Sequence, residues 1–391
     1  CIPTKVLLRT AEVLTLAREG KEFGVLTENV RLDLPAAVAR KDKIVQERRR
    51  GVDLLMSKNK ATVYPGTGSI VAPGKVVVAG KDGKHELEGR NIIIATGSAP
   101  KSLPGVVIDE KMIISSTGAL ALTDLPAHIV IIGAGAVGVE FASLFQEFGS
   151  KVTLIEALPQ ILPLEDKDSA AEVARAFRAR GIRMMTGARV GSIKTSDGGV
   201  SVQVTASDGA VEEITADKLL MAVGRRPVTE DLGLESSGVK SERGFVIVDG
   251  NMRTNVQGIY AIGDCCTISG MGAHLQLAHV ASAEGILAVE TIAGQDAHPL
   301  DYNAIPRAVY SHPEVGSIGL TEDQAVQQGY EIKVGKFPLR ANSKTGILGE
   351  RGGMVKIIAD ARYGEILGMH MVGPVATELV VEIAIAKRLE S

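Results

Sequence analysis

The feature that most constrains this chain is a glycine-rich loop between a buried strand and a helix. The apolar run Ile129–Ile132 is followed by Gly-Ala-Gly-Ala-Val-Gly at residues 133–138, and a helix is predicted over Ala136–Phe148. Gly149 closes that helix, and a second apolar strand is predicted over Lys151–Ile155. Strand, crossover helix and strand in this order form a βαβ unit, whose strands lie in one parallel sheet. The chain therefore contains at least one α/β domain with a Rossmann-like layout.

The glycine spacing in this loop is that of a dinucleotide-binding turn. Gly133 makes the tight turn, Gly135 lets the backbone approach a pyrophosphate, and Gly138 lets helix and strand pack closely. The N–H groups at the helix N-terminus then face the phosphates. Glu156 follows the next strand, 18 residues after Gly138, where its carboxylate can accept hydrogen bonds from both ribose hydroxyls and would repel a 2′-phosphate. NAD is therefore favoured over NADP, and a glycine-rich turn without a nucleotide is the competing interpretation.

The composition is that of a globular protein with several domains. The chain has 391 residues, of which 45% are hydrophobic and 23% charged, and this length suggests two to four domains. The net charge of -3, the lack of Trp and an aromatic content of 3% argue against a nucleic-acid partner. No apolar run is long enough to cross a membrane. Three cysteines do not make a disulfide framework, so a cytoplasmic location is expected.

Helices and short strands alternate along the rest of the chain. Apolar residues at helical spacing predict a helix over residues 1–22, and a second, charged helix is predicted over residues 35–58. Short strands bounded by turn residues follow, among them Ala61–Tyr64, with a hairpin-type turn at Lys81–Lys84. The other predicted strands are Ser69–Ala72, Lys75–Ala79, Asn91–Ala95, Lys218–Val223, Val334–Pro338, Met354–Ala359 and Ile366–Val372, and the other helices are Asp168–Arg180, 277–293 and 376–389.

Cys1 stands immediately before the first predicted helix, in the sequence Cys-Ile-Pro-Thr-Lys. The positive end of a helix dipole lowers the pKa of a neighbouring thiol, because it stabilises the thiolate. Lys5 adds a positive charge one helical turn away. Taken alone, these residues leave two interpretations open, a reactive cysteine or an exposed terminal cysteine without a role.

The same five residues resemble the second half of the redox motif C-x-x-x-x-C-I-P-[ST]-K of the pyridine nucleotide-disulfide oxidoreductases, which are flavoenzymes. Ile-Pro-Thr-Lys is most similar to the dihydrolipoamide dehydrogenase branch. Glu156 agrees with that branch, because the glutathione branch usually uses NADP. The similarity extends over essentially all 391 residues. The other matching segments, in order, are Ile92–Ser98, residues 133–138 with Glu140, Val223–Pro227, Gly258–Asp264, and Lys336–Pro338 to Ala341–Ser343.

The resemblance implies a set of catalytic and cofactor-binding residues. Cys1 would be the redox cysteine nearer the flavin, and Lys5 and Glu140 would form an ion pair beside the flavin and the nicotinamide. Asp264 would accept a hydrogen bond from the ribityl chain of FAD. The remaining positions assigned to FAD and NAD binding are Thr96, Gly97, Gly133, Gly135, Gly138, Glu156, Gly224, Leu277 and Ala278.

The resemblance also implies a reaction, an architecture and partners. Dihydrolipoamide would reduce an enzyme disulfide, and the electrons would pass through FAD to NAD⁺. We expect two Rossmann-like dinucleotide-binding domains, for FAD (1–108 and 224–299) and for NAD (109–223), followed by an α+β interface domain (300–391). The expected partners are a second copy of the chain and the lipoyl domain of a 2-oxo acid dehydrogenase or glycine cleavage complex. No nucleic acid or membrane partner is expected.

Three elements of the family pattern are not found in this sequence. They are the N-terminal strand and glycine loop for the ADP half of FAD, the partner cysteine five residues before Cys1, and the C-terminal His–Glu pair. We therefore expect the chain as written to hold FAD weakly and not to turn over lipoamide, unlike its parent enzyme. The alternatives are a related thiol or mercuric reductase and a non-catalytic NAD-binding protein. Cys265 and Cys266 are expected only to pack, and no metal site is expected, since no spacing resembles a zinc or iron–sulfur motif.

Overall fold

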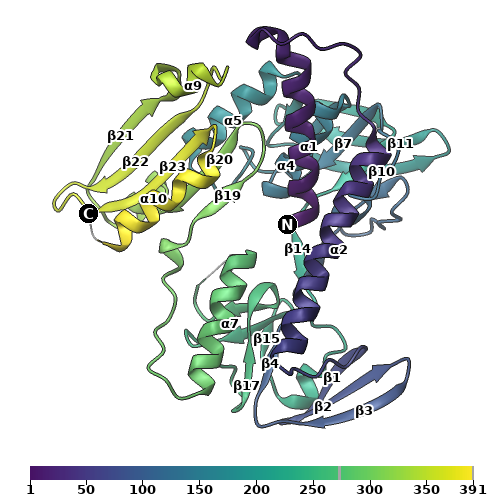
Figure 1. Ribbon diagram of the computed structural model, residues 1–391, viewed down its shortest axis with the longest axis vertical. Coiled ribbons are helices and arrows are strands. Elements are labelled where there is room, and N and C mark those ends of the chain that lie inside the picture. The colour runs from purple at the N-terminus through teal and green to yellow at the C-terminus, as the bar shows by residue number, and fades with distance from the viewer. Residues whose placement is uncertain (272–273, 390–391) are drawn as a thin grey trace. The chain divides into compact units, whose positions relative to one another are not determined.

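The computed structural model describes residues 1–271 and 274–389, and its chain divides into two compact units (Figure 1). The first unit comprises Cys1–Val45, Pro100–Gly224 and Asn303–Ser391, and the second comprises Gln46–Ala99 and Arg225–Tyr302. Both units mix helices with parallel and antiparallel sheets, so the predicted α/β class is confirmed. Among the described residues, no helix is both long and apolar enough to span a membrane.

A five-stranded parallel sheet forms the centre of the first unit. Its strand order is β6-β13-β7-β8-β9. Ile129, Val130 and Ile131 of β7 are fully buried, because both faces of the sheet are covered. Helix α4, Ala136–Phe148, joins β7 to its parallel neighbour β8. The strands are β6 (Ile113–Ile114), β13 (Lys218–Met221), β7 (His128–Ile132), β8 (Lys151–Ile155) and β9 (Arg183–Met185).

A three-stranded antiparallel sheet packs with this parallel sheet. Val200, Val202 and Val204 alternate along β11 and are buried in one cluster with Leu219 and Met221 of β13. Alternation with a period of two is the signature of a strand that buries one face. The three strands are β10 (Arg189–Ser196), β11 (Gly199–Thr205) and β12 (Val211–Ala216).

Helix α1, Ile2–Glu19, packs on α4 through a single apolar face. Leu7, Ala11 and Leu14 are buried at intervals of three and four residues, which is the spacing of one side of a helix. They share a core cluster with Phe141 of α4. This packing fixes the first turn of α1 against α4.

An antiparallel sheet of five strands completes the first unit, in the order β19-β20-β23-β22-β21. Helix α10, Ala376–Arg388, packs against β20 and β23. Val380 of α10 is buried there with Ile318, Met369 and Met371. The strands are β19 (Arg307–Val309), β20 (Glu314–Gly319), β21 (Ile332–Pro338), β22 (Met354–Asp360) and β23 (Ile366–Gly373), and the short helices are α8 (Glu322–Gln327) and α9 (Ser343–Ile347).

Lys356 of β22 is fully buried among carboxylates. Its Nζ lies 2.8 Å from Asp166 Oδ1 and 2.6 Å from Asp168 Oδ2, at the start of helix α5 (Lys167–Ala179). Glu322 Oε2 lies 2.7 Å from the same Nζ. Burial raises the pKa of both aspartates, but hydrogen bonds from Lys356 and from backbone or lysine donors outweigh it, so each pKa lies below its usual value. The cluster connects the start of α5 to the antiparallel sheet that contains β22.

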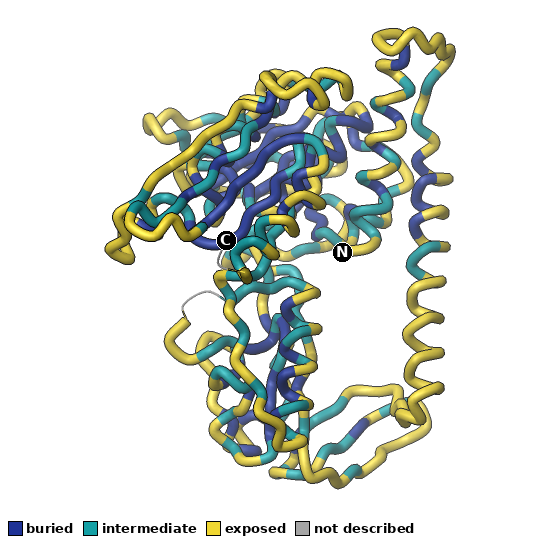
Figure 2. The backbone as a smooth tube through the Cα atoms, turned by 60° about the vertical axis from the view of Figure 1, so that its left-hand side comes forward, coloured by how far each residue is buried: buried dark blue, intermediate teal, exposed yellow. Residues whose placement is uncertain are grey.

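The second unit consists of small sheets around helix α7, Ala278–Ile292. Strands β4 (Ile92–Ile94) and β17 (Ile259–Ala261) pair in parallel. Most residues of β3 are exposed, whereas β1 and β2 each bury one residue, Ile70 and Val78, and further buried positions lie in α7 and the other strands of this unit (Figure 2). The remaining elements are β1 (Thr67–Ala72), β2 (Lys75–Gly80), β3 (Gly83–Glu88), β5 (Ser98–Pro100), β14 (Arg225–Pro227), α6 (Leu234–Ser237), β15 (Ser241–Glu242), β16 (Phe245–Val248) and β18 (Cys266–Ile268).

Two of the predicted segments differ from the structure. Ala61–Tyr64 is not a strand; these residues are exposed, and Pro65 after them has no N–H for a sheet ladder. Residues Gly83–Glu88, of which only the beginning was predicted as a turn, form β3 and pair with β2. Almost every residue of β3 is exposed, and its sequence does not alternate between apolar and polar residues. The helix predicted over residues 35–58 is α2, Leu34–Lys58. The predicted three-domain division stays a prediction.

Candidate functional site

The glycine loop after β7 leaves room beside its backbone at one position only. A Cβ atom on Gly133 would lie 2.3 Å from the carbonyl oxygen of Ala222, and one on Gly138 would lie 1.8 Å from the carbonyl oxygen of Gly133. Gly133 also has a φ of +97°, which disfavours any other residue. At Gly135 no heavy atom lies within 4 Å of a Cβ position. Close packing therefore requires glycine at positions 133 and 138. At position 135 the lack of a side chain leaves open space at the start of α4.

Glu156 lies directly after β8, and its buried carboxylate is held beside the loop. Its Oε2 accepts a hydrogen bond of 2.7 Å from the Ala134 N–H, and its Oε1 accepts one of 2.9 Å from the Leu158 N–H. The open space at Gly135, the N-terminus of α4 and this carboxylate fit the phosphates and the ribose of a nicotinamide dinucleotide. The hydrogen bond from Glu156 to a ribose stays a prediction.

Lys5 and Glu140 form an ion pair between α1 and α4. The Lys5 Nζ lies 2.7 Å from both carboxylate oxygens, and the Glu140 side chain is 7% exposed against 32% for Lys5. The Tyr310 N–H donates to Glu140 Oε1 at 2.9 Å, and the Lys5 Nζ lies 4.6 Å from the centre of the Tyr310 ring. Burial raises the Tyr310 pKa, and the neighbouring carboxylates raise it further. No motif marks Tyr310 in the sequence, where it directly follows strand β19.

Cys1 is the residue before the first turn of α1, and its side chain is exposed. Pro3 lies within the first positions of that helix, where its missing N–H is tolerated. The Lys5 N–H donates to the Cys1 carbonyl at 3.3 Å, so the ion pair with Glu140 begins one helical turn from the thiol. Cys1 forms no disulfide with either of the other cysteines. The first unit therefore places the Cys1 thiol and the Lys5 cation one turn apart at the start of α1, and the Glu140 carboxylate of α4 is paired with that cation.

In the second unit, Asp264 is part of a three-residue polar cluster. The Ser98 hydroxyl donates to Asp264 Oδ2. Arg225 Nε donates to the Ser98 hydroxyl at 2.6 Å, and Arg225 Nη2 donates to the Ser98 carbonyl at 2.7 Å. Arg225 Nε lies 3.8 Å from Asp264 Oδ2. Ser98 and Arg225 fell within matching segments, but neither was singled out, because their contact appears only when β5 and β14 pair.

The remaining predicted cofactor residues lie at turns and helix starts. Gly97 has a φ of +71°, and its carbonyl accepts the Val228 N–H at 3.0 Å. Thr96 is exposed, just beyond the end of β4. Leu277 is the N-cap of α7, and Ala278 is the exposed first residue of that helix.

Gly224, in the first unit, has a φ of +105° and accepts the Lys101 N–H at 3.0 Å through its carbonyl. No heavy atom lies within 4 Å of its Cβ position, so a side chain there would be excluded by the backbone conformation alone.

The parallel pair β4–β17 carries polar groups at one end of both strands. Thr96 and Gly97 follow β4, and Gly263 and Asp264 follow β17. Ligands of α/β sheets bind outside the carboxyl ends of parallel strands, and the exposed start of α7 offers N–H groups as well. These residues fit part of a flavin nucleotide site, with Asp264 as the acceptor for a hydroxyl.

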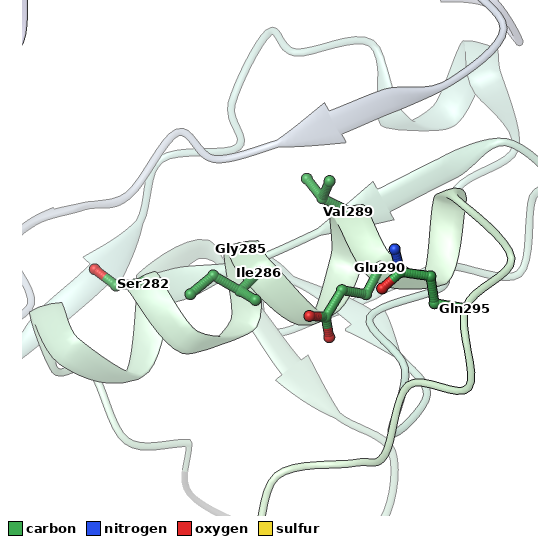
Figure 3. A pocket seen from close by; sticks show the side chains of 6 residues that line it. All are labelled: Ser282, Gly285, Ile286, Val289, Glu290 and Gln295. Atoms are coloured by element: carbon green, nitrogen blue, oxygen red, sulfur yellow. The ribbon is translucent and has the colours of Figure 1, made fainter. Parts of the chain in front are cut away.

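Helix α7 also borders a shallow apolar hollow, shown in Figure 3. Ile286 and Val289 are exposed there, at 62% and 56%. Glu290 is the one titratable side chain among the residues that line it, so the hollow has no catalytic constellation. Its lining residues are Ser282, Gly285, Ile286, Val289, Glu290 and Gln295.

Comparison with known families accounts for nearly the whole chain. Residues 1–285 match the family described as pyridine nucleotide-disulphide oxidoreductase, and residues 305–391 match its dimerisation domain. Among curated proteins, a dihydrolipoyl dehydrogenase of Bacillus subtilis is 42% identical over 403 aligned positions, covering 100% of this chain and 83% of its own. The mitochondrial dihydrolipoyl dehydrogenase of Pisum sativum is 41% identical, covering 100% of this chain and 77% of its own.

Solved structures give the same fold. LpdA from Mycobacterium tuberculosis superposes with a TM-score of 0.89 at 29% identity, over 100% of this chain and 84% of its own. The HOCl-induced flavoprotein disulfide reductase RclA from Escherichia coli superposes with a TM-score of 0.84 at 28% identity, over 100% of this chain and 83% of its own.

Proposed function

Because the chain belongs to the pyridine nucleotide-disulphide oxidoreductase family, we propose that Cys1, Lys5 and Glu140 carry the catalytic steps of a dihydrolipoyl dehydrogenase. The reaction is the oxidation of dihydrolipoamide to lipoamide with reduction of NAD⁺, and the family uses FAD and NAD. The observation that carries the proposal is the Lys5–Glu140 ion pair, one helical turn from the Cys1 thiol. A cation held there by a buried carboxylate can stabilise negative charge that develops near the thiol.

The residues of this chain have separate tasks in that reaction. Dihydrolipoamide loses two electrons and two protons, and NAD⁺ takes up two electrons and one proton. FAD, when bound, supplies the two-electron transfer between thiol and nicotinamide. Cys1 would form a disulfide with the partner cysteine five residues before it; dihydrolipoamide would reduce that disulfide by thiol–disulfide exchange, and Cys1 would be left as a thiolate. Glu140 holds Lys5 through both carboxylate oxygens, and the Tyr310 N–H fixes Glu140 in turn.

The glycine loop and Glu156 bind NAD in this proposal. Gly135 supports the role of the loop, because its open side admits a pyrophosphate. Glu156 gives the preference for NAD over NADP, since a 2′-phosphate would meet a buried carboxylate. Each Glu156 oxygen accepts one backbone N–H, so each retains a lone pair that could accept a ribose hydroxyl.

FAD is held by residues at the ends of β4 and β17 and at the start of α7. Asp264, positioned by Ser98 and Arg225, accepts a hydrogen bond from the ribityl chain. The architecture that we propose is an FAD domain at 1–108 and 224–299, an NAD domain at 109–223 and an interface domain at 300–391. The other FAD and NAD positions are Thr96, Gly97, Gly224, Leu277 and Ala278.

The chain acts as a homodimer, which the match of residues 305–391 to a dimerisation domain supports. Its protein substrate is the lipoyl domain of a 2-oxo acid dehydrogenase or glycine cleavage complex, working in the cytoplasm or the mitochondrial matrix. The names of the bacterial and mitochondrial relatives support both the substrate and these compartments.

Replacement of Lys5 tests the role of the ion pair. In an FAD-loaded protein that also carries the partner cysteine five residues before Cys1, Lys5→Met is expected to lower kcat for dihydrolipoamide-dependent NADH formation by about 100-fold, because a preorganised charge near the reacting atoms is lost. Arg9→Met is the matched control, since Arg9 lies on α1 but is exposed and forms an ion pair with Glu12. Wild-type kcat in Lys5→Met would contradict the proposal. A higher kcat/KM with Hg²⁺ than with lipoamide would instead favour a mercuric reductase.

A further inference from the structure

Three side chains that bind transition metals meet inside the second unit, and none of them has a role in the function proposed above. Cys266, His274 and Glu284 each offer one ligand atom, and these atoms all lie within 4.8 Å of one another. Cys266 begins β18, Glu284 lies in α7, and His274 lies in the segment between them. Eight and ten residues separate the three along the chain, so no metal-binding spacing is visible in the sequence.

His274 is the member of this cluster whose surroundings demand a ligand. Its side chain is 2% exposed, and neither ring nitrogen has a hydrogen-bond partner among the described residues. Nε2 lies 3.2 Å from Glu284 Oε1, but without the alignment of a hydrogen bond. A buried imidazole without an aligned hydrogen bond loses the free energy of its hydration, and the contact with Glu284 offsets this loss only when the imidazole is protonated. A bound cation would compensate for this lost hydration. In a tetrahedral zinc site, two ligand atoms that are nitrogen and oxygen lie about 3.3 Å apart.

Glu284 is held in place by two donors from other elements. The Gly263 N–H donates to its Oε2 at 2.7 Å, and the Tyr302 hydroxyl donates to its Oε1 at 2.7 Å. The carboxylate is fully buried. Hydrogen bonds of this kind orient metal-binding carboxylates in known sites, and Oε1 retains a lone pair that faces His274.

Cys266 supplies a sulfur atom that is also fully buried. Its Sγ lies 3.3 Å from the Gly263 carbonyl, to which the thiol donates. The adjacent Cys265 points its sulfur to other acceptors, the carbonyls of Ile94 and Ile262, and is no member of the cluster. The two neighbouring cysteines therefore form a natural pair of test and control positions.

We propose that Cys266, His274 and Glu284 bind one divalent ion of the zinc class. Thiolate, imidazole and carboxylate are all zinc ligands, with bonds of about 2.0–2.3 Å, and a movement of about 1 Å brings the three atoms onto one ion. The fourth position is open to water. The ion would have a structural role, because it would join α7 to the turn at Gly263 that bears Asp264.

Metal content measures this site without any assay of activity. The chain is equilibrated with Zn²⁺, passed into metal-free buffer and analysed by inductively coupled plasma mass spectrometry. About one Zn²⁺ per chain is expected in a Cys1→Ser background, which removes the exposed thiol. Cys266→Ser and His274→Gln are each expected to reduce retention at least tenfold. Cys265→Ser and His279→Gln should retain the ion.

Co²⁺ supplies a second readout, because a cobalt–thiolate bond gives a charge-transfer band in the near ultraviolet. The band should appear with Co²⁺ and vanish in Cys266→Ser. If Cys266→Ser does not fold, His274→Gln, at a position in a loop, decides by the loss of bound Zn²⁺ with an unchanged circular dichroism spectrum. The proposal is overturned if the starting protein retains no Zn²⁺, or if His274→Gln retains as much as His279→Gln.

Discussion

Glu140 shows how a single residue becomes part of a site through contacts made elsewhere in the fold. Its carboxylate is buried, accepts both contacts from Lys5 and takes a further N–H from Tyr310. The family resemblance identified Lys5 and Glu140 from motif positions. Tyr310 could not be found that way, because its N–H contact with Glu140 and its ring contact with Lys5 both depend on the folded structure.

Two glycines of the same loop should respond differently to an added methyl group. In Gly138→Ala the Cβ would meet the Gly133 carbonyl at 1.8 Å, so thermal stability should fall, with a cost of about 1–3 kcal/mol for overpacking. In Gly135→Ala the Cβ meets no atom, so stability should be retained, whereas NADH affinity should fall at least tenfold.

Differential scanning calorimetry and NADH fluorescence titration measure these two effects separately. Unchanged NADH affinity in Gly135→Ala would show that no phosphate approaches the backbone at Gly135.

The buried ion cluster of Lys356 is a property of elements, since it connects α5, α8 and β22. Lys356→Met should destabilise the chain by about 3–5 kcal/mol at pH 7, because it leaves carboxylates buried without their cation. The pKa values of Asp166 and Asp168 are lowered in the folded state, so their stabilising effect is present above about pH 4 and is lost as the pH falls below it.

The difference in unfolding free energy between Lys356→Met and the unchanged chain should therefore shrink below about pH 4. Urea titrations at pH 7 and pH 3.5 measure it, with the exposed Lys333→Met on β21 as the control. A difference that is equal at both pH values would rule out this account of the cluster.

Two elements in the core of the parallel sheet were predicted with correct ends, whereas one exposed strand was not predicted. Helix α4 and strand β8 have the bounds that the sequence predicts, because buried runs and Gly149 mark them clearly. Strand β3 was missed, since its residues are nearly all exposed. The cluster of Cys266, His274 and Glu284 was missed for another reason. It depends on the path of the segment between β18 and α7, which the local spacing of residue types in the sequence does not indicate.

At the scale of the whole molecule, α10 carries an exposed apolar stripe that a monomer does not explain. Val381, Ile385 and Leu389 repeat every four residues and are 50%, 57% and 69% exposed. Ile385→Glu should shift the protein toward monomer in sedimentation velocity, because a charge would be buried in a two-fold interface. Glu382→Gln, one residue off the stripe, should leave the dimer intact. A dimer that survives Ile385→Glu at micromolar concentration would place the interface elsewhere.

The Cys1 sulfur is proposed to be the redox group that exchanges electrons with the bound flavin. This role is tested by the absorption spectrum, after anaerobic addition of dihydrolipoamide, of an FAD-loaded protein that also carries the partner cysteine five residues before Cys1, both unchanged and as Cys1→Ser. We predict a long-wavelength thiolate–flavin band in the unchanged protein and its complete loss, together with loss of NADH formation, in Cys1→Ser. An identical band and an identical rate of NADH formation in both proteins would contradict the account.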